Sequence, residues 1–102
     1  MSVPTKYTQD AARNLIVKIL NEGGDLHLTW HCEHDRMVKR NVSSQDIEYV
    51  LETGVIIKEP EWDYKCKDWK YSVEGMDLEG DSLTVVSVII TQAFAIRVIT
   101  VY

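Results

Sequence analysis

The end of the chain most constrains the fold, because it holds two β-branched apolar runs with almost nothing between them. Leu83–Thr91 and Phe94–Tyr102 are nearly continuous in apolar residues, and Gln92-Ala93 is the expected turn. Runs of this kind are typical of strands that helices cover on at least one face. We therefore expect two neighbouring central strands here.

Two segments earlier in the chain predict helices. Thr8–Glu22 carries apolar residues in pairs four apart, and two glycines follow it. This is the pattern of an amphipathic helix that packs on a sheet. Ser43 is a suitable N-cap with Asp46 three residues later, and Gly54 is a suitable C′ residue, so a second helix is expected between them.

Three further segments have strand character: Asp25–Trp30, Val55–Lys58 and Lys67–Val73. The stretch between the last two, which contains Pro60, is interpreted as a loop. Consecutive strands joined by short turns favour antiparallel neighbours. The predicted fold class is therefore α+β, with an N-terminal helix followed by β-α-α-β-β-β-β and an antiparallel sheet packed by helices.

Length and composition limit the classes of protein. The 102 residues suit a single domain, and the chain is 45% hydrophobic and 26% charged, as globular proteins usually are. No apolar run is long enough for a membrane span, and the N-terminus lacks a signal-peptide core, so we expect a cytoplasmic protein that does not bind membranes. A net charge of −5 argues against coating of nucleic acid by the whole surface, although local patches remain compatible with it.

The segment from Trp30 to Gly54 concentrates the residues that could carry chemistry. A helix started near His31 would put Cys32, Arg36 and Arg40 on one face, four residues apart. Guanidinium groups there could bind an RNA phosphate and stabilise the charge that develops during cleavage. The structural alternative is that the arginines form ion pairs with acidic residues of the helices, namely Glu33, Asp46 or Glu48.

Two histidines, His31 and His34, belong to the same segment. They could act as general acid and base, or they could simply pack beside Trp30. A second functional interpretation is a zinc site made by these histidines with Cys32 or Asp35 and with Cys66. Two cysteines are too few for a disulfide scaffold, and no Cys-x-x-Cys motif accompanies them, so our prediction is no metal and no other cofactor.

Aromatic residues and lysines are interleaved in the predicted loop and the start of the strand that follows it: Trp62, Lys65, Lys67, Trp69 and Lys70. Such a composition could stack bases while neutralising phosphates, and we take these residues as candidate RNA contacts. Alternatively, the lysines protect an edge strand while the aromatics pack inward. Arg97 interrupts the last apolar strand, so it must face the open side of the sheet or find a partner.

The pattern HCEHDRMVKRNVSSQDIEYVLETGVII, followed by YSVEG and by LTVVSVIITQAFAIRVITVY, resembles the bacterial domain-of-unknown-function family forty-two fifty-eight. The resemblance covers about residues 25–102 and leaves 1–24 as an added helix. Arg36 and Arg40 match the family's two arginines, and Thr100 and Tyr102 match its closing pair. Where the family has a histidine before the first arginine, this chain has Cys32, so His31 and His34 both stay candidates.

That family is likened to the RelE and BrnT toxins, so the resemblance implies a RelE-like core and metal-free ribonuclease activity of a toxin and antitoxin pair. It also implies an antitoxin partner of the zinc-finger type, and a homodimer is compatible with it. The implied catalytic residues are Arg36, Arg40 and a histidine, with Arg97 or Tyr102 contributing from the sheet. Two alternatives remain: a non-catalytic protein-interaction domain of the same fold, and a zinc-binding protein.

Overall fold

Helix α1 (Gln9–Asn21) forms where the apolar periodicity predicts it. The Thr8 hydroxyl caps it by accepting the N–H of Ala11, and the chain leaves it through Gly23, whose φ of 82° suits a residue without a Cβ. The computed structural model describes residues 4–102. The buried side chains of the helix are Ala12, Ile16 and Ile19.

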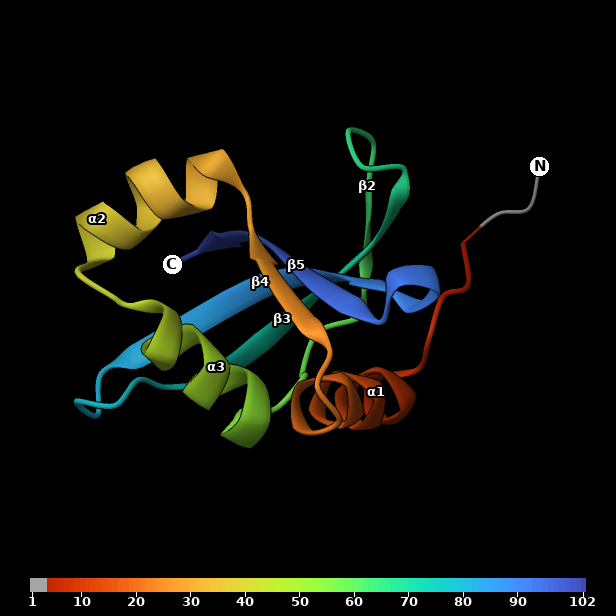
Figure 1. The fold of residues 1–102 in the computed structure, drawn as a ribbon, viewed down its shortest axis with the longest axis horizontal. Helices are drawn as coiled ribbons and strands as arrows, with labels where there is room; N and C mark the ends of the chain where they lie inside the picture. Colours follow the sequence, from red (N-terminus) through yellow and green to blue (C-terminus); the bar gives the residue numbers. More distant parts are fainter. Residues whose placement is uncertain (1–3) are drawn as a thin grey trace.

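The remaining elements follow in chain order: β1 (Asp25–Leu28), the π-helix η1 (Cys32–Arg36), α2 (Met37–Arg40), α3 (Ser44–Thr53), β2 (Glu61–Asp63), β3 (Asp68–Met76), β4 (Ser82–Ile90), the 3-10 helix η2 (Thr91–Ala93) and β5 (Ala95–Val101). The strands form one five-stranded sheet in the order β1-β5-β4-β3-β2 (Figure 1). The protein is therefore α+β, as predicted.

The expected all-antiparallel sheet is wrong at one edge, because β1 pairs with β5 in parallel. The other three pairs are antiparallel, so the sheet is mixed. Parallel neighbours need a long crossover. Here the connection consists of all the elements between β1 and β5. The first and last strands of the chain therefore lie side by side.

The strand expected at Val55–Lys58 is also wrong. Only Val55 pairs, in an isolated bridge with Glu74, and the segment is largely exposed. β2 forms instead in the predicted loop, where Trp62 lies opposite Trp69 in the register of β3. Strand propensity alone does not make a strand, because the run needs a partner edge, and beyond Val55 this segment leaves the edge of β3.

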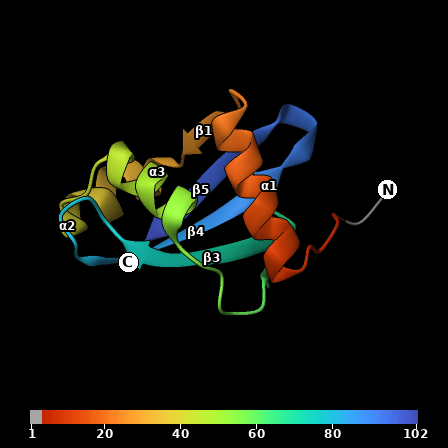
Figure 2. The same ribbon diagram turned by 90° about the horizontal axis from the view of Figure 1, so that it is seen from below.

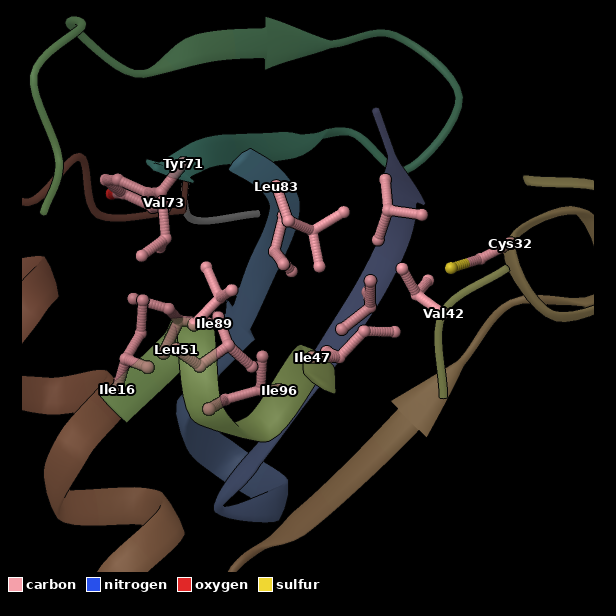
Figure 3. Packing of buried hydrophobic residues seen from close by; sticks show 14 of the residues in the cluster. Ile16, Cys32, Val42, Ile47, Leu51, Tyr71, Val73, Leu83, Ile89 and Ile96 are labelled. Atoms are coloured by element: carbon pink, nitrogen blue, oxygen red, sulfur yellow. The ribbon is translucent and has the colours of Figure 1, made fainter. Parts of the chain in front are cut away.

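Helices α1 and α3 cover one face of the sheet, as Figure 2 shows from below. In Figure 1 they lie below the strands, whereas α2 and the turn between β2 and β3 lie above. Buried side chains from α1, α3 and the sheet meet in a single cluster (Figure 3). Members from each layer are Ile16, Ile47, Leu51, Tyr71, Val73, Leu83, Ile89 and Ile96.

Gly54 is required for a different reason from the one that its place after a helix indicates. Its φ of −76° is accessible to every residue, so it is not a left-handed C′ residue. A Cβ there would lie 2.7 Å from the carbonyl oxygens of Glu74 and Val50. Gly75 lies against Gly54, since a Cβ added at Gly75 would be 3.1 Å from the Cα of Gly54. The two glycines let the end of α3 approach the backbone of β3.

The start of α3 is held by the predicted capping box. The N–H of Ser43 donates to Asp46, and the N–H of Asp46 donates to the Ser43 hydroxyl. The other carboxylate oxygen of Asp46 accepts the N–H of Leu78 at 3.0 Å. The backbone donor of Ser43, then that of Leu78, keeps the pKa of Asp46 below its usual range.

Asp46 should make stability depend on acid pH. Because its pKa is lower in the folded than in the unfolded chain, its contribution is complete above the unfolded value of about 4 and is lost as pH falls through the folded value. We expect Asp46→Asn to lower the free energy of unfolding at pH 7 by about 1 kcal/mol or less, and the deficit to shrink in acid. Urea titrations at several pH values measure it, with the exposed Glu48→Gln on the same helix as control. A deficit that is constant with pH contradicts the assignment.

Candidate functional site

The π-helix η1 shapes the segment in which most candidate residues lie. The N–H of Met37 donates to the carbonyl of Cys32, five residues earlier, and both side chains are buried. One wide turn thus puts two apolar residues on the core side that an α-helix would place on different faces. The Thr29 hydroxyl supports the turn, since it accepts the N–H of Cys32 and donates to the carbonyl of Ile99 on β5.

The wide turn also corrects the expected common face of Cys32, Arg36 and Arg40. Cys32 is fully buried and faces Val42 (Figure 3), while Arg36 is half-buried and Arg40 is exposed. Burial, with a smaller effect of Glu33, raises the pKa of Cys32 to about 11. The thiol is therefore protonated at neutral pH and is a core residue, not a nucleophile.

Both arginines bond to the main chain of the sheet. Arg36 donates its Nε to the carbonyl of Val101 at 3.2 Å, and Arg40 donates an Nη to the carbonyl of Ser82 at 2.6 Å. Within residues 4–102, neither makes the ion pair with an acidic helix residue that was the structural alternative. Each bond uses one donor of a guanidinium that has five. The arginines thus tie η1 and α2 to the ends of β5 and β4 and keep donors for a ligand.

The two histidines are exposed on the same segment. The His34 ring stacks on Trp30 with 4.8 Å between centroids, as the packing alternative anticipated. The Nδ1 atom of His31 lies 3.7 Å from one carboxylate oxygen of Asp35. The Nζ atom of Lys39 lies 2.9 Å from the other. The hydrogen bond from Lys39 is the main reason why the pKa of Asp35 is lowered. Both imidazoles are accessible to a ligand.

The structure separates the two sheet residues that were predicted to join this site. Tyr102 follows Val101, the residue that Arg36 contacts, and its backbone pairs with Thr84. Its side chain is exposed. Arg97 lies farther back along β5, opposite His27 on β1 and Val88 on β4. Tyr102 is therefore placed beside the arginine segment, and Arg97 is not.

Arg97 belongs to the sheet face opposite α1 and α3. Its neighbours along β5, Ile96 and Val98, enter the core, so Arg97 points the other way and is exposed, as the open-side interpretation predicts. The charge of Arg97 has a lowering effect on the pKa of Cys66 in the β2–β3 turn. Burial first, and then Asp63, have the larger opposite effect and raise the pKa of Cys66.

The predicted RNA contacts divide into two groups. Trp62 and Trp69 meet edge to face at 5.3 Å, Trp69 packs against the core, and Lys70 lies 3.8 Å from Asp63. These three side chains are engaged within the protein. Lys65 and Lys67, by contrast, are exposed in the turn and remain available for phosphates.

Neither of two hollows in the surface of residues 4–102 is lined by a predicted catalytic residue. A pocket of about 270 Å³ lies between the segment from Pro4 to Tyr7 and the end of β4, and a wider one of about 530 Å³ lies beside α2. Among residues 4–102, no three His, Cys, Asp or Glu side chains converge as metal ligands do. Helices in the same range are all too short or too polar to cross a membrane.

A family model described as Domain of unknown function (DUF4258) matches residues 28–102. The chain belongs to this family. The DUF4258 match confirms the family that the arginine motif and the closing strand indicated. It begins at the end of β1 and covers every later element, so α1 lies outside it. No curated protein and no solved structure matches the chain.

Two exposed residues of the DUF4258 region escaped the prediction. Trp30 is 74% exposed and Val38 is 71% exposed, although both are large and apolar. With His34 they recur at intervals of four residues, a spacing that is visible in the sequence. The apolar periodicity of a sequence predicts the buried face of a helix, and it does not indicate that apolar residues also recur on the outer face.

Proposed function

We propose that this chain is a metal-independent ribonuclease of the kind found in bacterial toxin and antitoxin pairs, with a RelE-like core. The observation that carries the proposal is the placement of Arg36 and Arg40 at the ends of β5 and β4. Each guanidinium is positioned by one bond to the backbone and presents its remaining donors. Pre-positioned donors of this kind are what charge stabilisation in a transition state needs.

The proposed chemistry is attack of a ribose 2′-hydroxyl on the adjacent phosphorus. Arg36 and Arg40 bind the phosphate oxygens on which charge develops. His31 or His34 removes the hydroxyl proton, and the other histidine or Tyr102 protonates the leaving oxygen. An imidazole is suited to both roles near neutral pH, since its ordinary pKa is about 6.5.

In this proposal the RNA continues across the open face of the sheet towards the β2–β3 turn. Arg97 lies on that face, and Lys65 and Lys67 are exposed at the turn with Tyr64, which is 85% exposed. Lysines and an exposed ring can hold phosphates and a base without sequence preference. The net charge of −5 makes this a local patch, so binding should weaken steeply with salt.

The activity of the wild-type protein tests the proposal. We expect purified chain to cleave single-stranded RNA in EDTA, and to inhibit bacterial growth when it is expressed alone. A neighbouring zinc-finger antitoxin, if co-expressed, should relieve the inhibition. Gel analysis of a labelled RNA measures cleavage. Folded protein that neither cleaves RNA nor slows growth contradicts the proposal.

The second candidate is a non-catalytic protein-interaction domain. Trp30 and Val38 favour it, because both present exposed apolar surface on one segment, which a partner could cover. The acidic net charge favours it as well. The zinc-binding alternative has less support, since Cys32 is buried and no three candidate ligands converge among residues 4–102.

A further inference from the structure

An exposed row of side chains runs along the outside of η1 and α2, and we call Trp30, His34 and Val38 the outer row. The three residues are four apart, and Trp30 stacks on His34. The stacked rings hold Trp30 and His34 together, and Val38 is the exposed apolar residue of α2 that follows them. Within residues 4–102 the row is left exposed and no other helix packs over it.

The pocket of about 530 Å³ beside α2 continues this surface, since Val38 belongs to both. We call it the α2 groove. Its apolar wall is Met37, Val38 and Val42, and its rim carries Glu33 and Glu79. Asp46 also lines it, but its oxygens are occupied by the capping box and by the N–H of Leu78. The rest of the lining is polar, so the groove is mixed in character, and its two free carboxylates suit an amphipathic ligand that carries basic groups.

The charged residues that line the groove are all acidic: Glu33, Asp46 and Glu79. The nearby cations lie outside this lining, with Lys39 paired to Asp35 and Arg40 bonded to the carbonyl of Ser82. The chain as a whole is acidic, with a net charge of −5. Complementary charge therefore favours a basic partner at this surface.

We propose that the outer row and the α2 groove bind an amphipathic helix of a partner protein, whose apolar side chains cover Trp30 and Val38 and whose lysines or arginines reach Glu33 and Glu79. A helix laid in an apolar groove uses such anchors at intervals of three or four residues. Trp30 serves as the central anchor, because tryptophan supplies the largest buried area on binding. The proposal does not depend on the chain being a nuclease, although a helix seated there also covers His34.

The test uses two designed helical peptides of the same leucine pattern, one with lysines and one with glutamates at the flanking positions. NMR titration of the isotope-labelled full chain should show saturable shifts of the Trp30 indole and of residues 32–42 with the lysine peptide only. Val38→Lys and Trp30→Ala should each weaken binding about tenfold or more. Glu33→Gln with Glu79→Gln should weaken it severalfold and reduce its salt dependence.

The matched control is Ile57→Lys, which introduces the same charge at another exposed apolar residue, far from α2 in the segment that Gln9 contacts. It should bind the peptide as the wild type does. Circular dichroism should find every variant folded, because all the altered side chains are exposed. Absence of shifts, equal binding of the glutamate peptide, or unchanged binding by Val38→Lys overturns the proposal. So does a wild-type dimer in sedimentation that Val38→Lys converts to monomer, since a second copy would then be the occupant.

Discussion

Arg36→Ala should reduce RNA cleavage by about 10²-fold or more, the usual consequence of removing a positioned transition-state donor. Arg36→Lys should restore little of the rate, because a lysine keeps the charge but cannot contact Val101 and a phosphate with one planar fork. Arg40→Ala should lower the rate similarly. Single-turnover cleavage of a labelled RNA measures the effect.

Stability must be followed in the same experiment. Arg36 holds the end of β5 through the Val101 carbonyl, so Arg36→Ala should also cost about 1 kcal/mol and several degrees in Tm. Assays at 25 °C on protein shown to be folded separate the two effects. The exposed Lys18→Ala on α1 is the charge-matched control and should retain full activity. If it loses as much activity as Arg36→Ala, the arginine has no specific role.

Ile16→Ala should destabilise the protein by about 2–5 kcal/mol, a large part of the 5–15 kcal/mol that is usual for a domain. Ile16 is fully buried and lies in the cluster between α1, α3 and the sheet (Figure 3). The loss should lower Tm by about 10 °C or more. Chemical denaturation followed by tryptophan fluorescence measures the free energy directly.

This experiment also decides how far α1 belongs to the folding unit, since α1 lies outside the family match. Arg13 on the same helix donates to the carbonyls of Gly54 and Glu52 at the end of α3, which links the two helices. Val17→Ala, on the partly exposed side of α1, is the control and should cost less than about 1 kcal/mol. If Ile16→Ala costs no more than Val17→Ala, α1 is an appendage that the core does not need.

Local physics made several elements predictable from the sequence. Thr8 and Ser43 cap helices through hydrogen bonds that span three residues, and the apolar runs of β4 and β5 describe buried strands without reference to any partner. The arginine motif also identified the family correctly. Each of these signals is complete within a short stretch of chain.

The strand at Val55–Lys58 illustrates the opposite case. Its β-branched residues have strand propensity, but β3 pairs with Glu61–Asp63 instead. The pairing brings Trp62 edge to face onto Trp69, and local propensity does not show which segment will meet this partner. The parallel edge is similar, because nothing near Asp25–Leu28 encodes that its neighbour will be the last strand of the chain.

For the candidate site, the sequence determined which residues are present and how they are spaced, and the tertiary structure decided what each can do. Arg36 and Arg40 were predicted on one helix face, with ion pairs to acidic helix residues as the structural alternative, yet their actual partners are carbonyls 65 and 42 residues further along the chain. Cys32 was a candidate ligand until the π-helix placed it in the core beside Met37. The physical reason is common to both cases. Packing between distant segments decides which strand-end carbonyl an arginine meets and where a helix widens into a π-turn. Neither outcome can be recognised in the short stretch of sequence where it occurs.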